Sequence, residues 1–115
     1  MTEPSVFTRI VNREIPAEIV AETDTLLAIR DIAPQAPVHV VIFPKTQEYV
    51  TVSELAAGDP ALLAELVALS KQVADELCGG EYRFIFNSGP GAGQTVFHVH
   101  GHVLGGGFEE KSLVG

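Results

Sequence analysis

The chain has 115 residues, 46% of them hydrophobic and 19% charged, which is the composition of a globular protein with one core. Fifteen acidic residues against seven scattered basic ones give a net charge of −8, so a nucleic-acid partner is not expected. No apolar run reaches the roughly 18 residues of a membrane span and no secretory leader precedes the domain, so we expect a single cytoplasmic domain over residues 1–115 with no membrane partner. The single cysteine, Cys78, excludes an internal disulfide and a Cys-x-x-Cys metal site.

The first part of the sequence predicts a short helix followed by three strands. Val6, Phe7 and Ile10 have helical spacing within residues 6–13, and Pro16 lies beyond the end of that segment. A turn-forming sequence at 22–24 separates two short β-type runs, and a third run is strongly apolar. The predicted strands are residues 17–21, 25–30 and 37–43.

A long amphipathic helix is predicted in the second half. Asp59 and Pro60 form a favourable helix start, and Gly79 with Gly80 ends the pattern about twenty residues later. Between them apolar residues recur every three or four positions, at Leu62, Leu66, Leu69, Val73 and Leu77. Two further strands are predicted at 82–87 and 95–104. Runs of strands with one main helix indicate an α+β fold built on an antiparallel sheet.

Three of the four histidines, His98, His100 and His102, occupy alternate positions in the last predicted strand. In an extended strand they share one face at a spacing of about 6.6 Å, whereas Phe97 and Val99 point to the core. Imidazoles titrate near neutrality and can serve as nucleophile, proton carrier or hydrogen-bond donor. The same row could instead supply ligands to zinc, and the spacing does not separate these two interpretations.

Two further features lie near this row in the predicted sheet. His39 lies within the apolar strand 37–43 and requires a polar partner there, for which another histidine across the sheet is suitable. The glycine-rich segment 87–95 leads directly into the histidine strand, and its backbone N–H groups can approach an anion closely. It is not a P-loop, because no Gly-Lys-Ser/Thr follows, and not a dinucleotide fingerprint, because no helix follows.

The histidine row reads His-Val-His-Gly-His-Val-Leu at 98–104 and resembles the His-φ-His-φ-His-φ-φ signature of the histidine triad (HIT) superfamily. The segment 31–37 with His39, and Asn87 with the Gly-Gln-Thr sequence at 93–95, resemble the branch called histidine triad nucleotide-binding proteins. The resemblance covers a domain core at about 7–106, followed by a C-terminal tail at 107–115. The chain departs from the pattern at Gly101, where an apolar residue is typical, and its tail lacks the tryptophan of some members.

This resemblance implies a HIT-like fold, in which a five-stranded antiparallel sheet carries one long helix and a short N-terminal helix and extends across a homodimer. It implies a purine nucleoside monophosphate or phosphoramidate as ligand and cleavage at the α-phosphorus, typically of a P–N bond. It implies neither a metal nor another cofactor.

By the same resemblance, His100 attacks phosphorus and forms a nucleotidyl-histidine intermediate that water hydrolyses. His98 and His39 support and orient it, His102 binds phosphate oxygens together with the loop amides, and Thr95 contacts the leaving group. Asp31 matches the carboxylate that binds both ribose hydroxyls. The other implied nucleotide-binding positions are Phe7, Ile10, Ile29 and Ile32 at the base, Asn87 at the ribose or phosphate, and Gly93, Gln94 and Thr95 in the loop.

Two alternative functions stay open. A zinc-dependent hydrolase would use His98, His100 and His102 or His39, and predicts stoichiometric metal and loss of activity with a chelator. A nucleotide-binding or regulatory module with incidental turnover predicts tight binding of a nucleoside monophosphate with negligible hydrolysis.

Overall fold

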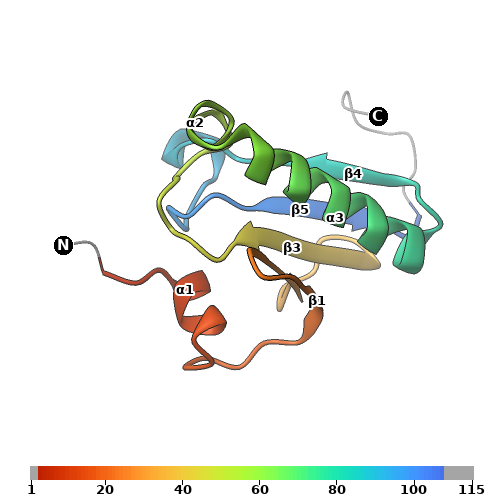
Figure 1. Ribbon diagram of the computed structural model, residues 1–115. Coiled ribbons are helices and arrows are strands. Elements are labelled where there is room, and N and C mark those ends of the chain that lie inside the picture. The colour runs from red at the N-terminus through yellow and green to blue at the C-terminus, as the bar shows by residue number, and fades with distance from the viewer. Residues whose placement is uncertain (1–2, 108–115) are drawn as a thin grey trace.

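The computed structural model describes residues 3–107, which form a five-stranded sheet and the helices around it (Figure 1). The elements in chain order are α1 (Val6–Val11), β1 (Ile19–Glu22), β2 (Leu26–Arg30), β3 (Val38–Pro44), α2 (Val52–Gly58), α3 (Pro60–Cys78), β4 (Tyr82–Ile85), a 3-10 turn (Pro90–Ala92) and β5 (Gly101–Gly105). The predicted α+β class is confirmed. Most of the predicted tail, residues 108–115, lies outside the described residues.

The sheet has the last strand of the chain, β5, at an interior position between β3 and β4. Its order is β1-β2-β3-β5-β4, and all neighbouring strands are antiparallel. His102 of β5 lies opposite Val41 of β3 on one side and Ile85 of β4 on the other. Because directly opposite residues point to the same face of a sheet, these three side chains share one face.

The long helix α3 covers the other face (Figure 1). The predicted start and end of this helix are confirmed: the Asp59 side chain accepts a hydrogen bond from the Leu62 N–H at 3.0 Å, and Gly79 has a left-handed φ of 66°. The buried residues of this core are Leu26, Ala28, Val40, Ile42, Leu55, Leu62, Leu66, Leu69, Val73, Ala74, Val99 and Val103. The helix therefore supplies the main hydrophobic support beneath the central strands.

A smaller core forms on the histidine face, where α1 packs. Phe7 stacks on Phe43 with ring centroids 4.3 Å apart, and Ile10 packs in the same cluster. The remaining buried members are Leu27, Ile29 and Val41. Since α1 has only six residues, it covers part of this face and leaves room for a cavity beside it.

The predicted strand at 95–104 is wrong in its first half, because β5 begins only at Gly101. Gly101 is the first residue of this segment that pairs with β3, where it lies opposite Ile42, whereas Val99 bonds through its N–H to the Tyr49 carbonyl outside the sheet. The alternation nevertheless holds at Val99, which is buried as predicted. It fails at Phe97, which is 54% exposed instead of facing the core.

Gly101 is a close-approach position on the face of β5 toward α3. A Cβ atom there would lie 2.4 Å from Cε1 of Phe84 and 3.0 Å from Cζ of Phe86. The two rings therefore fill the volume that an apolar side chain at this position would need, and Phe84 itself packs on the α3 core.

Helix α2 lies in a segment for which no helix is predicted above. Its signal is present as Thr51-x-x-Glu54, the pattern of a capping box. Thr51 Oγ1 accepts the Glu54 N–H at 3.2 Å, and the Glu54 carboxylate accepts the Val50 N–H at 3.0 Å. The helix contributes the fully buried Leu55 to the α3 core.

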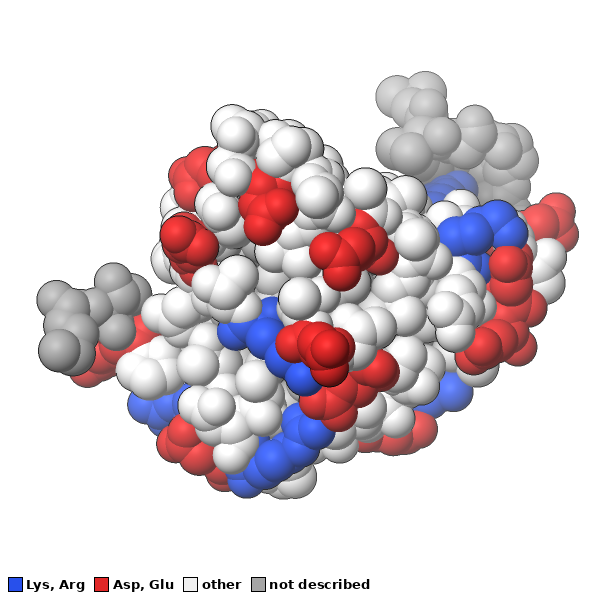
Figure 2. Space-filling model, viewed as in Figure 1, with Lys and Arg blue, Asp and Glu red and all other residues white. Residues whose placement is uncertain are grey.

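The surface is acidic, in line with the composition. On the face shown in Figure 2, blue basic side chains lie singly among red acidic ones. Several of them form ion pairs, such as Lys71 with Asp75 and Arg13 with Glu22. Within residues 3–107 there is no helix with the length and hydropathy needed to cross a bilayer.

Candidate active site

A cavity of about 400 Å³ opens on the histidine face between α1 and the sheet. Most of its wall is apolar, and its polar end is formed by Asp31, His100 and His102, whereas Arg30 pairs with Glu18. The apolar lining residues are Val6, Phe7, Ile10, Ile15, Pro16, Ala17, Ile29, Ile32, Val41 and Val96, and the polar ones are Arg30, Asp31, Thr95, His100 and His102. Eight of the predicted site residues therefore line one cavity, although Ile32 is 99% exposed and lies at its rim.

His100 presents a free imidazole nitrogen to this cavity. Its Nδ1–H donates to the His98 carbonyl at 2.8 Å, so the neutral ring keeps its lone pair on Nε2. The ring is buried and meets Phe7 edge to face, with centroids 4.9 Å apart. Burial lowers the pKa of His100, against the opposing effects of the His98 carbonyl and the Asp31 charge. The ring is thus neutral at physiological pH, and its free Nε2 has the lone pair that a nucleophile requires.

His98 has no nitrogen available for chemistry. Its Nδ1 lies 2.6 Å from the Ser5 hydroxyl, and its Nε2 lies 2.7 Å from the Pro44 carbonyl. The carbonyl can only accept, so Nε2 carries the proton and the Ser5 hydroxyl donates to Nδ1. The ring is fully buried, and burial lowers its pKa. His98 therefore acts through its backbone carbonyl, which orients His100.

Ser5 and its partners are site residues that the sequence analysis missed. The Ser5 N–H and the Thr8 hydroxyl both donate to Gln47 Oε1, at 2.8 and 2.6 Å. Ser5 also caps α1 by accepting the Thr8 N–H at 3.0 Å. A serine directly before the predicted helix at 6–13 is a recognisable helix-cap signal in the sequence. No signal in the sequence indicates that its hydroxyl contacts a histidine 93 positions away.

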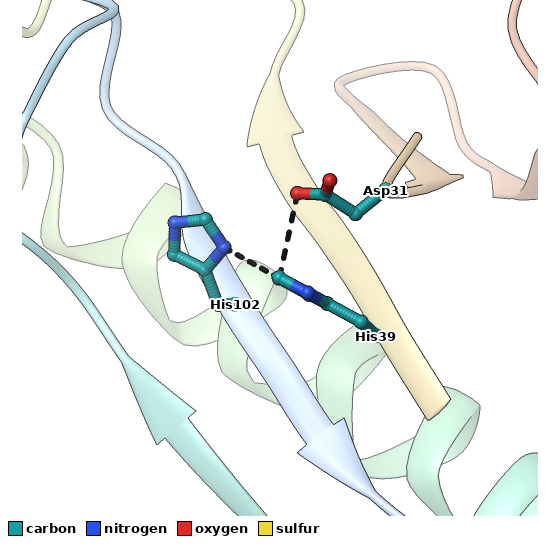
Figure 3. Close-up of side chains that lie close together, drawn as sticks. All are labelled: Asp31, His39 and His102. Carbon is teal, nitrogen blue, oxygen red and sulfur yellow. Dashed lines mark hydrogen bonds and ion pairs between the residues drawn. The ribbon is translucent and has the colours of Figure 1, made fainter. Parts of the chain in front are cut away.

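His39 and His102 form a hydrogen-bonded pair, as predicted for His39 and another histidine (Figure 3). The Gln35 N–H donates to His39 Nδ1 at 3.0 Å, so the proton of the neutral His39 ring lies on Nε2. That proton faces His102 Nδ1 at 2.9 Å and Asp31 Oδ2 at 3.5 Å. His102 in turn keeps its own proton on Nε2. His39 contacts His102 rather than His100, so its orienting effect reaches the nucleophile only indirectly.

Desolvation of the His102 ring lowers its pKa to about 4, and the neighbouring histidines add to this effect. His102 is therefore neutral at physiological pH and offers an N–H donor, not a positive charge.

The structure offers one cluster that could hold a metal ion, formed by Asp31, His39 and His102, whose ligand atoms lie within 4.8 Å of one another in the described part of the chain. A metal on His39 would require the Nε2 lone pair, whereas the Gln35 N–H at Nδ1 places the proton on Nε2. The geometry favours a hydrogen-bond chain here. The alternative set of zinc ligands that includes His98 does not fit, because both nitrogens of the His98 ring already form hydrogen bonds.

Three of the predicted loop and phosphate residues lie outside the main cavity. Gln94 is buried, and its amide bonds to the Gly89 N–H and to the Val50 carbonyl at 2.8 and 2.7 Å, so it shapes the loop. Gly93 is exposed and holds a left-handed φ of 91°. Asn87 lines a separate cavity of about 220 Å³ that also reaches His39 and His102.

Comparisons with known proteins agree on one relationship. A family model described as the HIT domain matches residues 12–109. An uncharacterized HIT-like protein of Synechococcus elongatus is 48% identical over 108 residues, covering 92% of this chain and 93% of that protein. A purine nucleoside phosphoramidase of Escherichia coli is 37% identical over 108 residues, covering 92% and 90%. A solved HIT family hydrolase from Clostridium thermocellum superposes with a TM-score of 0.89 at 39% identity, covering 98% and 99%.

Proposed function

The chain belongs to the HIT domain family, and we propose that it is a nucleoside phosphoramidase that cleaves the P–N bond of purine nucleoside 5′-phosphoramidates. The observation that carries this proposal is the open Nε2 of His100 at the polar end of an apolar cavity. The relative from Escherichia coli that is named a purine nucleoside phosphoramidase supports the substrate class.

The cavity suits a nucleoside. Phe7, Ile10 and Ile29 offer a flat apolar wall for a purine base. Asp31 lies at the polar end, where its carboxylate can accept hydrogen bonds from two ribose hydroxyls. One of its oxygens already accepts the Ala33 N–H at 2.8 Å, which fixes the orientation of the carboxylate. The phosphate of such a ligand then reaches His100 and His102.

The proposed reaction proceeds in two steps. His100 Nε2 attacks the α-phosphorus, the P–N bond breaks, and the nitrogen departs with a proton as an amine. Water then attacks the nucleotidyl-histidine intermediate, the P–Nε2 bond breaks, and the nucleoside monophosphate is released. Overall, water supplies a hydroxyl to phosphorus and a proton to the amine, and His100 is regenerated.

The other polar groups stabilise the phosphate during these steps. His102 Nε2–H can donate to a phosphate oxygen because His39, which also faces Asp31, donates to the other nitrogen of the His102 ring. Thr95 lines the cavity and is exposed, so its hydroxyl can contact the leaving nitrogen. Gln94 and Gly93 contribute by holding the loop that presents Thr95.

The test is the release of AMP from adenosine 5′-phosphoramidate by the wild-type protein and the His100→Ala variant, each with and without a chelator. We expect chelator-resistant turnover that falls at least about a thousandfold in the variant. A single turnover stopped with an alkaline denaturant should trap label on the wild-type protein alone, because a P–N bond to histidine is labile in acid. Retained turnover in His100→Ala contradicts the covalent step, loss with chelator indicates zinc, and tight AMP binding without turnover indicates a binding module.

We also propose that two copies associate through the edge of the sheet. β4 is the last strand in the sheet order of the described residues, and a sheet can extend at such an edge into a second copy, as the family resemblance implies. Sedimentation equilibrium of the wild-type protein should give twice the mass of one chain. A single-chain mass at micromolar concentration contradicts this association.

A further inference from the structure

A second cavity adjoins the proposed nucleoside cavity. It measures about 470 Å³ and shares three lining residues with the first cavity, namely Val6, Thr95 and Val96. The residues that line only this second cavity are Glu3 and Ser5 of the N-terminal segment, Gln47 of the loop after β3, and Phe97. The two cavities are therefore neighbours that meet at Thr95, the residue proposed to contact the leaving nitrogen.

Two of the polar groups in this second cavity are already engaged within the protein. The Ser5 hydroxyl bonds to His98, and Gln47 bonds through both ends of its amide, to Ser5 and to the Glu3 carbonyl. They therefore have little capacity left to recognise a ligand. The groups that can discriminate between ligands are the ring of Phe97 and the carboxylate of Glu3.

Phe97 presents an unusual apolar surface. It is 54% exposed although both residues that follow it, His98 and Val99, are almost fully buried. An exposed aromatic ring that lines a cavity provides a contact surface for an aromatic or aliphatic group. The lining contains no lysine or arginine, and Glu3 gives it a negative charge. The cavity is therefore unfavourable for a second phosphate or a carboxylate.

We propose that this cavity is the subsite for the leaving group, and that it selects apolar or aromatic amines without negative charge. The inference rests on the proposed phosphoramidase function. The reacting bond is the same P–N bond: water adds a hydroxyl to phosphorus and a proton to nitrogen, and the departing amine carries its organic substituent out through the cavity beside Phe97.

The experiment compares three substrates with the same nucleotide: unsubstituted adenosine 5′-phosphoramidate, its N-phenethyl derivative, and the derivative of phenylalanine, which adds a carboxylate to the same leaving group. The ratio of kcat/KM values between two substrates is the readout, so that each variant serves as its own reference. In the wild-type protein we expect the phenethyl substrate to exceed the phenylalanine one.

Phe97→Ala should lower the ratio of the phenethyl to the unsubstituted substrate by about threefold to tenfold, because the aromatic contact is lost. Glu3→Gln should raise the ratio of the phenylalanine to the phenethyl substrate about twofold, as for an exposed charge. Val67→Ala and Glu76→Gln, exposed positions on α3, are the controls and should change neither ratio.

The subsite proposal is overturned if both test variants leave the kcat/KM ratios unchanged. It is also overturned if Phe97→Ala lowers kcat/KM equally for all three substrates. Failure of the wild-type protein on the unsubstituted substrate instead overturns the proposed function, and the subsite with it. Cleavage of the unsubstituted substrate with unchanged ratios leaves the proposed function standing and removes only the subsite.

Discussion

The Ser5→Ala substitution tests how the first histidine of the row is held. The Ser5 hydroxyl caps α1 through the Thr8 N–H and donates to the fully buried His98 Nδ1. Loss of a serine cap costs about 1 kcal/mol. A buried nitrogen left without its donor costs about 1–3 kcal/mol more. Because one hydroxyl serves both contacts, the sum of about 2–4 kcal/mol is an upper range.

The same substitution should affect catalysis without affecting nucleotide binding. When His98 loses one of its two side-chain anchors, its carbonyl no longer fixes the ring of His100 as firmly. We therefore expect kcat for adenosine 5′-phosphoramidate to fall about tenfold, with KM within about twofold, because Ser5 does not line the nucleoside cavity. Urea unfolding gives the stability, and initial rates give kcat and KM.

Two variants make the interpretation specific. Thr51→Ala removes the cap of α2 but none of the hydrogen bonds of the His98 ring, and should cost about 1 kcal/mol with no change in kcat. Ser5→Thr keeps a hydroxyl and should recover most of kcat. If Ser5→Ala costs no more than Thr51→Ala and retains full kcat, then the bond between Ser5 and His98 neither anchors the ring nor supports the nucleophile.

Three further outcomes follow from other contacts. Gly101→Ala should destabilise the fold by about 1–3 kcal/mol, since its Cβ would lie 2.4 Å from the Phe84 ring, and Phe84→Leu should relieve part of this cost in a double-mutant cycle followed by urea unfolding. The unfolded His102 titrates near 6.5 but the folded one near 4, so the unfolded state binds more protons between these values and stability falls as the pH drops. Titration of His102 should lower the free energy of unfolding by roughly 1–2 kcal/mol between pH 7 and pH 5, and this loss should be absent from His102→Asn. Equal pH dependence of the two proteins in urea unfolding would contradict this expectation. Asp31→Asn should raise KM for adenosine 5′-phosphoramidate about tenfold but change KM for the 2′-deoxy substrate much less, and an equal rise for both would show that Asp31 does not bind the ribose.

The parts of the fold that the sequence predicts well are those with a local signal. The long helix, Pro60–Cys78, lies between the capping residue Asp59 and the left-handed Gly79, and both are visible in the sequence. His39 needs a polar partner because it is polar in an apolar strand, and it finds His102, which is 63 positions away. The need for a partner is visible in the sequence, while the sheet order that supplies it is not.

Where the sequence prediction fails, a non-local contact decides the structure. Apolar alternation extends back to residue 95, but β5 starts at Gly101 because the segment before it leaves the sheet and Val99 bonds to Tyr49. Phe97 is exposed for the same reason. Gln94 matches a nucleotide-binding position by resemblance, yet its side-chain amide already forms hydrogen bonds with Gly89 and Val50. In each case the competing hydrogen-bond partner lies far along the chain or in an irregular segment.

The three histidines show why spacing alone does not assign chemistry. All carry the same ring at alternate positions, but a ring nitrogen is nucleophile, donor or anchor according to what its other nitrogen meets. His98 meets a hydroxyl and a carbonyl and is fully engaged. His100 meets one carbonyl and keeps a lone pair. His102 meets a donating histidine and keeps an N–H. A lone pair and an N–H thus lie side by side because the His98 carbonyl holds the His100 ring, and His39 the His102 ring, in opposite tautomers. These two tautomers are what the proposed nucleophile and the proposed phosphate donor require.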